Sequence, residues 1–136
     1  MSLQNAKRRA ARMIAQHESF VPHMYLDSVS YVTVGFGKMF RTAASTASVN
    51  FIKVTARPQR PATVAEKAAE WTTMQRLSPA GTRINYAARH YAQYRTLEIT
   101  RAEGTRLLEL SLNDAIAILR ANYPGLNAFP RTRRSP

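Results

Sequence analysis

The sequence predicts an α+β fold in which a first helix is followed by a small β-hairpin and then by further helices. Apolar residues recur every three or four positions over residues 3–17, which is typical of an amphipathic helix. Residues 31–34 are aromatic and β-branched and are followed by Gly35 and Gly37, which indicates a strand that ends in a turn. Helix-start signals at Thr63 and Thr100 precede later apolar stripes. We therefore expect a mainly helical fold with a small sheet lobe.

The composition limits both the size of the protein and its chemistry. The chain has 136 residues with a formal net charge of +12, enough for one domain with a modest core. It contains no cysteine and only three histidines, which excludes disulfides and a cysteine nucleophile and argues against a zinc site. We expect no metal and no cofactor. The positive charge favours a polyanionic partner such as nucleic acid, an acidic membrane surface or the bacterial envelope. No stretch is apolar enough for membrane insertion.

Glu18 falls at the end of the first predicted helix. The pair Val21-Pro22 stops the helix, because the residue before a proline avoids the helical region. The C-terminal end of a helix carries negative partial charge, which disfavours an ionised carboxylate. We therefore expect Glu18 to hold its proton longer than usual if it is also partly buried.

A hairpin is predicted directly after this helix. Residues 24–26 can pair with residues 31–34 across a turn that begins at Asp27, and Gly35 and Gly37 end the second strand. A further strand is expected within residues 49–54.

Three later helices are predicted. Thr63 and Glu66 form a capping box that starts a helix running to Leu77, and residues 84–94 are expected to be helical. Thr100 and Glu103 form a second capping box, and the helix that follows stops near residue 123. We expect one domain over residues 1–130, with residues 41–98 as a middle region that contains an insertion. The basic tail 131–136 is expected to be disordered.

Glu18 and Asp27 together could perform acid–base chemistry. A carboxylic acid kept protonated and a second carboxylate kept ionised in a polar turn are the minimal groups for cleaving a glycosidic bond. The ordinary alternative is structural, because an aspartate in a turn usually accepts local backbone hydrogen bonds. A glutamate near a helix end is usually a solvated surface residue.

Residues 18–37 resemble the catalytic segment of the phage-type lysozymes, which form glycoside hydrolase family 24. That family carries a glutamate, then Tyr-x-Asp, then a Gly-Tyr-x-Thr-x-Gly-x-Gly run. The matching positions here are Glu18, Tyr25, Asp27, Tyr31, Thr33, Gly35 and Gly37. A second match covers residues 99–119, which resemble the long helix that links the two lobes in that family.

The resemblance implies a muramidase that cleaves the β-1,4 bond between N-acetylmuramic acid and N-acetylglucosamine in peptidoglycan. Glu18 would be the general acid, Asp27 would activate water or stabilise the oxocarbenium-like transition state, and Thr33 would position the water. Tyr25, Tyr31 and Gly37 would contact the glycan. Inverting chemistry of this kind places the two carboxyl groups about 6.5–9.5 Å apart.

The sequence departs from the family pattern at three points. Ser30 stands where the family has a glycine, and Lys38 stands where a histidine is common. The helical lobe expected after the linking helix is missing, so the C-terminal lobe is expected to be truncated, which would impair activity unless residues 41–98 or another chain supply the second wall. Without that wall, the leucine face of the last helix would be exposed.

Aromatic residues interleaved with arginines allow more than one role, of which packing is the most common for tyrosines at helical spacing. Trp71, Tyr86, Tyr91 and Tyr94 lie among several arginines, and such residues bind single-stranded nucleic acid, bind sugar rings or simply pack a helical subdomain. The alternative to a bacteriolytic enzyme is therefore a non-catalytic basic module that holds peptidoglycan or binds nucleic acid. Nucleic-acid binding by the enzyme itself would be nonspecific.

The N-terminal residues contain no secretory signal. The protein is therefore expected to be made in the cytoplasm and to act on the cell wall in the periplasm of a host or target bacterium. Lysozymes of this type reach the wall through a phage-encoded membrane hole or, as effectors, by injection into a rival cell.

Overall fold

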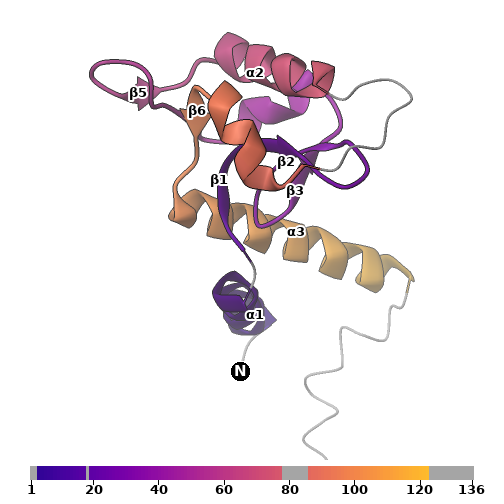
Figure 1. The fold of residues 1–136 in the computed structure, drawn as a ribbon. Coiled ribbons are helices and arrows are strands. Elements are labelled where there is room, and N and C mark those ends of the chain that lie inside the picture. Colours follow the sequence, from indigo (N-terminus) through magenta and orange to yellow (C-terminus); the bar gives the residue numbers. More distant parts are fainter. Residues whose placement is uncertain (1–2, 18, 78–85, 123–136) are drawn as a thin grey trace, which may run out of the picture. The chain divides into compact units, whose positions relative to one another are not determined.

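The computed structural model describes residues 3–17, 19–77 and 86–122 and confirms the α+β fold (Figure 1). The helices are α1 (Leu3–His17), α2 (Val64–Arg76) and α3 (Arg101–Asn122), with 3-10 helices η1 (Ala43–Ser48) and η2 (Ala88–Tyr94). The strands are β1 (Val21–Leu26), β2 (Val32–Gly35), β3 (Lys38–Phe40), β4 (Ile52–Lys53), β5 (Arg60–Pro61) and β6 (Leu97–Glu98). The chain divides into two compact units, one comprising Ser19–Gly104 and the other comprising Met1–Glu18 with Thr105–Pro136.

The first sheet contains the predicted hairpin and one additional strand. Its order is β1-β2-β3, with all neighbours antiparallel. Tyr25 pairs with Thr33 and Leu26 with Val32, as the predicted pairing across Asp27 requires. The pairing is irregular between Val21 and Tyr25, so β1 bends before it reaches the turn. The third strand was not predicted, because a three-residue strand leaves almost no periodic pattern in a sequence.

The second sheet has the order β5-β4-β6 and joins residues that are distant in sequence. Lys53 pairs with Leu97 and Ile52 with Glu98. The predicted strand at residues 49–54 is therefore only two residues long, at Ile52–Lys53. The backbone N–H of Ile99 donates to the carbonyl of Pro22 over 2.8 Å, which connects the end of β6 to the start of β1.

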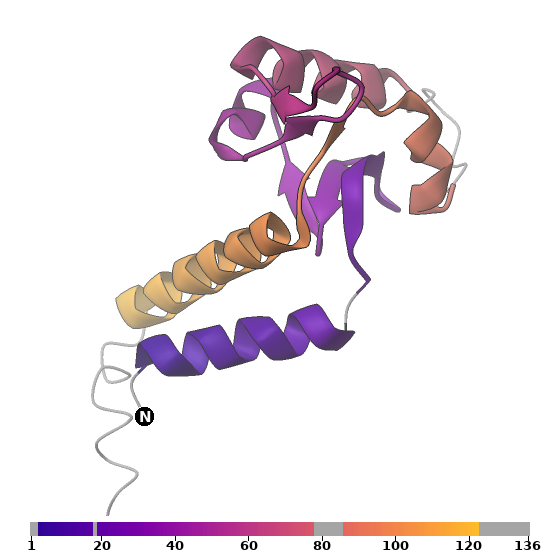
Figure 2. The same ribbon diagram turned by 90° about the vertical axis from the view of Figure 1, so that its left-hand side faces the viewer.

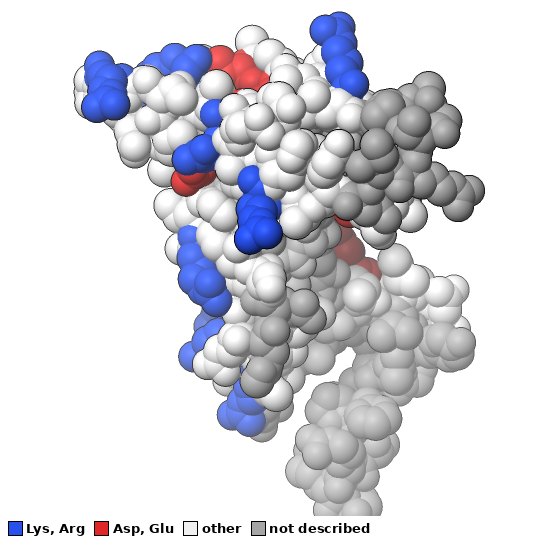
Figure 3. Space-filling model, in the orientation of Figure 1, with Lys and Arg blue, Asp and Glu red and all other residues white. Residues whose placement is uncertain are grey.

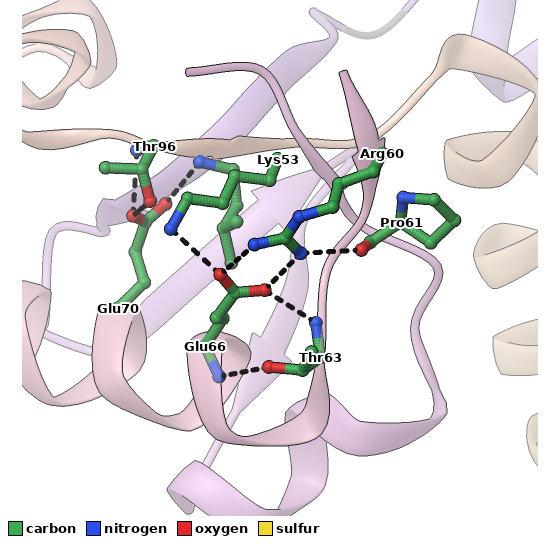
Figure 4. Close-up of polar contacts among 8 residues, drawn as sticks. Lys53, Arg60, Pro61, Thr63, Glu66, Glu70 and Thr96 are labelled. Atoms are coloured by element: carbon green, nitrogen blue, oxygen red, sulfur yellow. Dashed lines mark hydrogen bonds and ion pairs between the residues drawn. The ribbon is translucent and has the colours of Figure 1, made fainter. Parts of the chain in front are cut away.

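Helix α2 begins at the predicted capping box. Thr63 Oγ1 accepts from the backbone N–H of Glu66, and the Glu66 carboxylate accepts from the N–H of Thr63 (Figure 4). That carboxylate also binds Lys53 at 2.8 Å and Arg60 at 2.8 Å. Hydrogen bonds from Arg60, Lys53 and the Thr63 backbone hold the pKa of Glu66 well below its usual value. Because the folded pKa is depressed, the stabilisation from these contacts is present near neutral pH and is lost as the pH falls.

The core of the larger unit lies between α2 and the strands. Met24, Val32, Val34, Phe40, Val49, Phe51, Met74 and Leu97 are buried there. Figure 2 shows α2 lying over η1. On the same helix, the indole N–H of Trp71 donates to the carbonyl of Phe40 over 3.0 Å, so Trp71 ties α2 to the end of the first sheet.

A buried carboxylate joins α2 to the second sheet. Glu70 is only 5% exposed. Its Oε1 accepts from the backbone N–H of Thr96 over 2.8 Å and from the Thr96 hydroxyl over 2.7 Å, and its Oε2 accepts from the N–H of Leu97 over 3.1 Å (Figure 4). These bonds compensate for burying a charge and satisfy two backbone donors at the entry to β6.

The start of α3 packs closely against two phenylalanines. The rings of Phe20 and Phe36 lie 5.2 Å apart, and the guanidinium of Arg101 lies over both of them, at 5.7 and 5.3 Å. A Cβ added to Gly104 would lie 2.7 Å from Phe20 and 3.3 Å from Phe36. Glycine at this position therefore permits the close approach of the helix to the ring pair.

The predicted capping box at Thr100 is partly redirected. The backbone N–H of Glu103 donates to Thr100 Oγ1 over 3.1 Å, as predicted. The Glu103 carboxylate, however, also accepts from the backbone N–H of Asn50 over 2.8 Å. This long-range bond fixes the segment between η1 and β4 onto the start of α3.

The smaller unit consists of α1 and most of α3. An apolar hollow of about 150 Å³ lies between them, lined by Leu3, Ala6, Lys7, Ala10, Leu112 and Ile116. The Lys7 amine donates to the side chain of Asn113 beside this hollow. Neither these helices nor any other in the described residues is both long and apolar enough to cross a membrane.

Two further predictions concern the segment 84–94 and the tail 131–136. The segment predicted as helical at 84–94 forms a 3-10 helix from Ala88 to Tyr94, while residues 84–85 lie outside the described residues, as does the tail 131–136.

We predict that Glu70→Gln destabilises the protein by about 2 kcal/mol, because the amide must turn an N–H₂ group toward a buried N–H donor. Chemical denaturation measures this change. Asp114→Asn on the exposed part of α3 makes the same acid-to-amide change and should stay within about 0.5 kcal/mol of the parent. Equal effects of both substitutions would contradict a structural role for Glu70.

We predict that Gly104→Ala lowers the free energy of unfolding by about 1–3 kcal/mol, because the new methyl group overpacks the Phe20 ring. An exposed glycine-to-alanine change inside a helix normally has the opposite sign, a gain of about 1 kcal/mol. Thermal unfolding of the variant gives the sign directly. A gain in stability would show that the ring pair moves away freely.

Candidate functional site

Asp27 closes the turn between β1 and β2. Its Oδ1 accepts from the backbone N–H groups of Val29 and Tyr31, each over 2.9 Å. The backbone adds bonds from Ser30 N–H to the Asp27 carbonyl and from Asp27 N–H to the Tyr31 carbonyl, each over 3.0 Å. The structural interpretation of an aspartate in a turn therefore holds for Oδ1.

The other carboxylate oxygen, Oδ2, lies near Thr33. The Thr33 hydroxyl donates to the Tyr31 carbonyl over 2.9 Å and is 3.5 Å from Asp27 Oδ2. The second distance is long for an O–H···O bond. No other hydrogen bond to Oδ2 is found among the described residues. The turn thus fixes the carboxylate through one oxygen and leaves the other beside a hydroxyl.

Thr33 lies on β2, close to the Asp27 turn. It is 2% exposed and lies directly opposite Tyr25 in the strand pairing. Side chains of directly paired residues lie on the same face of a sheet. Tyr25 and Thr33 therefore share a face of the sheet, and Asp27 and Tyr31 lie in the turn that joins the two strands.

Two tyrosines flank the carboxylate. Burial, and secondly the negative charge of Asp27, raise the pKa of the Tyr25 phenol, so Tyr25 stays a neutral hydrogen-bond donor near neutral pH. Tyr31 is exposed, and the guanidinium of Arg41 lies 5.9 Å from its ring centre.

Ser30 adopts a left-handed backbone conformation, with φ of 66°. The family that the sequence resembles has a glycine at this position. The turn keeps the left-handed conformation that favours glycine, although the residue here is a serine. A side chain in this region costs about 1–2 kcal/mol. Gln75 on α2 donates to the Ser30 carbonyl over 3.5 Å, one contact that holds the turn against the helix.

Gly35 and Gly37 also have positive φ, of 68° and 104°. A Cβ on Gly35 would lie 3.2 Å from the Ile99 side chain, whereas nothing lies within 4 Å of the corresponding position on Gly37. Gly35 is therefore required by packing as well as by conformation. Gly37 is exposed and leaves open space beside the turn into β3.

Glu18, the predicted general acid, lies outside the described residues. The separation of the two carboxyl groups therefore stays a prediction. The structure brings together Tyr25, Asp27, Tyr31 and Thr33 within one hairpin, and it places Gly37 in the next turn of the same sheet.

Two arginines near this hairpin were not predicted. Arg41 lies over Tyr31, and Arg101 lies over Phe20 and Phe36. Their partners are separated from them by 10 to 81 positions along the chain, and a sequence carries no periodic signal for such pairs. An arginine in the first turn of a helix otherwise indicates only a solvated charge.

The four aromatic residues that the sequence places among arginines are Trp71, Tyr86, Tyr91 and Tyr94, and they differ in exposure. Trp71 and Tyr91 serve packing, since Trp71 bonds Phe40 and Tyr91 is buried. Tyr86 and Tyr94 are exposed. Of the arginines predicted to lie among them, Arg95 is paired with Glu98, and Arg83 lies outside the described residues.

Comparison with known proteins gave no match to any family model, to any curated protein or to any solved structure. Among the described residues, no three histidine, aspartate or glutamate side chains are grouped so that they could hold a metal ion.

We predict that Ser30→Gly raises the free energy of unfolding by about 1 kcal/mol, because glycine adopts the left-handed conformation without steric cost. Ser28→Gly is the matched control, since Ser28 lies in the same turn without a positive φ and should gain nothing. Chemical denaturation of both variants distinguishes them. An unchanged Ser30→Gly variant would mean that the turn relieves the strain by another route.

Proposed function

We propose that the protein is a glycoside hydrolase of the lysozyme type that cleaves the β-1,4 bond between N-acetylmuramic acid and N-acetylglucosamine in peptidoglycan. The observation that carries this proposal is the Asp27 carboxylate. Its Oδ1 is held by two backbone N–H groups, while Oδ2 lies beside the buried Thr33 hydroxyl. A preoriented carboxylate with one oxygen available is what the catalytic base of such an enzyme needs.

In this mechanism Asp27 acts through Oδ2. An inverting hydrolase uses one carboxylate to take a proton from water as the water attacks the anomeric carbon. The Thr33 hydroxyl is close enough to share that water with Oδ2. The two bonds to Oδ1 hold the Asp27 carboxylate in one orientation.

Glu18 supplies the second half of the reaction in this proposal. It donates a proton to the oxygen of the leaving sugar, so the glycosidic bond breaks as the water adds. This role comes from the resemblance of residues 18–37 to the catalytic segment of the phage-type lysozymes.

The charge of the protein suits an acidic polymer. Basic side chains are spread over the face drawn in Figure 3, and acidic ones are few there. The whole chain contains 20 lysine and arginine residues and 8 aspartate and glutamate residues. Such an excess attracts anionic wall polymers without selecting a sequence or a single ligand.

We predict that Asp27→Asn folds like the parent and loses at least about 100-fold in turnover of purified peptidoglycan. An asparagine oxygen can still accept from Val29 and Tyr31, so the turn survives while the charge on the other atom is lost. The release of reducing ends measures turnover. Glu18→Gln should produce a similar loss, because it cannot donate the proton.

Asp114→Asn is the matched control for this experiment, since it removes an exposed carboxylate from α3 and should retain parental turnover. Wall cleavage by Asp27→Asn at the parental rate would refute the assignment. Salt-dependent nucleic-acid binding by a parent protein that never cleaves wall material would favour the non-catalytic alternative.

A further inference from the structure

Three aromatic side chains form an exposed shelf on and beside η2, defined here as Tyr86, His90 and Tyr94. The rings of Tyr86 and His90 are stacked, with centres 3.9 Å apart and planes 13° from parallel. The Tyr94 ring meets His90 edge-on at 6.0 Å. Tyr86 is 45% exposed and Tyr94 is 37% exposed, so both phenols keep ring surface in contact with water.

The aromatic shelf is supported from below by a buried ring. Tyr91 is 3% exposed and meets His90 at 5.2 Å and Tyr86 at 6.4 Å, both edge-on. These contacts fix the orientation of the shelf, because edge-to-face aromatic pairs have a preferred geometry. A rigid ring loses little conformational entropy when a ligand packs against it.

The shelf belongs to the same compact unit as the β1–β2 hairpin. Helix η2, drawn in orange, packs against β1, the strand that leads directly into Asp27 (Figures 1 and 2). A polymer bound at the hairpin could therefore continue along η2 without leaving this unit. A short ligand would gain nothing from a second surface.

Within residues 86–98, the charges beside the shelf do not favour nucleic acid. Residues 86–98 contain two arginines and one glutamate. Arg95 is paired with Glu98 and also donates to the carbonyl of Ala92 over 2.8 Å. A single-stranded nucleic acid carries one phosphate per base and needs a basic groove beside the stacking rings. A pyranose ring instead presents C–H groups, whose positive partial charge is attracted to the negative face of an aromatic ring.

We infer that the aromatic shelf of Tyr86, His90 and Tyr94 is a non-catalytic binding surface for the glycan strand of peptidoglycan. The identity of the polymer rests on the proposed function, while the preference for a sugar ring rests on the shelf itself. Tyr86 and Tyr94 provide the stacking faces, and His90 holds Tyr86 in place.

Sedimentation with insoluble peptidoglycan tests the shelf, with every variant built on Asp27→Asn so that the proposed cleavage cannot alter the polymer. We expect the double variant Tyr86→Ala/Tyr94→Ala to bind about tenfold more weakly. Tyr86→Phe/Tyr94→Phe keeps both rings and should bind within about twofold of its parent. Val64→Ala, an exposed apolar change on α2, is the control for general surface effects.

Thermal unfolding of each variant confirms that it is folded before binding is compared. Unchanged binding of the folded alanine variant would overturn the shelf as a glycan site, even if the parent cleaves peptidoglycan. Ring-dependent binding by a parent that releases no reducing ends would support the shelf and refute the cleavage. A single-stranded oligonucleotide that binds through the same rings, while peptidoglycan does not, would also overturn the inference.

Discussion

The larger unit depends on one buried carboxylate. Glu70 accepts three hydrogen bonds from Thr96 and Leu97, and these bonds place β6 against α2. Strand β6 then pairs with β4, and Ile99 next to it binds the carbonyl of Pro22 in β1. A single side chain thus connects α2 to both small sheets. The second sheet is too small to be stable alone, because each of its strands is only two residues long and buries little apolar surface.

Most acidic residues of the larger unit hold the fold together. These residues are Glu66, Glu70, Glu98 and Glu103. Each carboxylate binds backbone N–H groups or the side chains of neighbouring residues. Asp27 differs from them, since its Oδ1 serves the turn and its Oδ2 lies beside Thr33. Within the larger unit, Asp27 is therefore the strongest candidate for a catalytic carboxylate, because only one of its two oxygens accepts backbone hydrogen bonds.

The strain at Ser30 and the order at Asp27 are linked. The left-handed residue lets the turn close within a few positions, and this closure points the N–H groups of Val29 and Tyr31 at Oδ1. A turn without the positive φ would separate these donors. The conformational cost at Ser30 is thereby offset by the hydrogen bonds that orient the carboxylate, a common arrangement at functional sites.

Local patterns determined the first helix, the hairpin register, the start of α2 and the position of Asp27, because each depends on residues within a few positions of one another. Tertiary structure decided the partners of Glu70, the redirection of Glu103 to Asn50, the exposure of Tyr86 and Tyr94, and the arginines over Phe20 and Tyr31. The hydrogen bonds and ring contacts among these features join residues 10 to 81 positions apart. Sequence periodicity carries no information at such separations, since it records which face of an element is buried and not what covers that face.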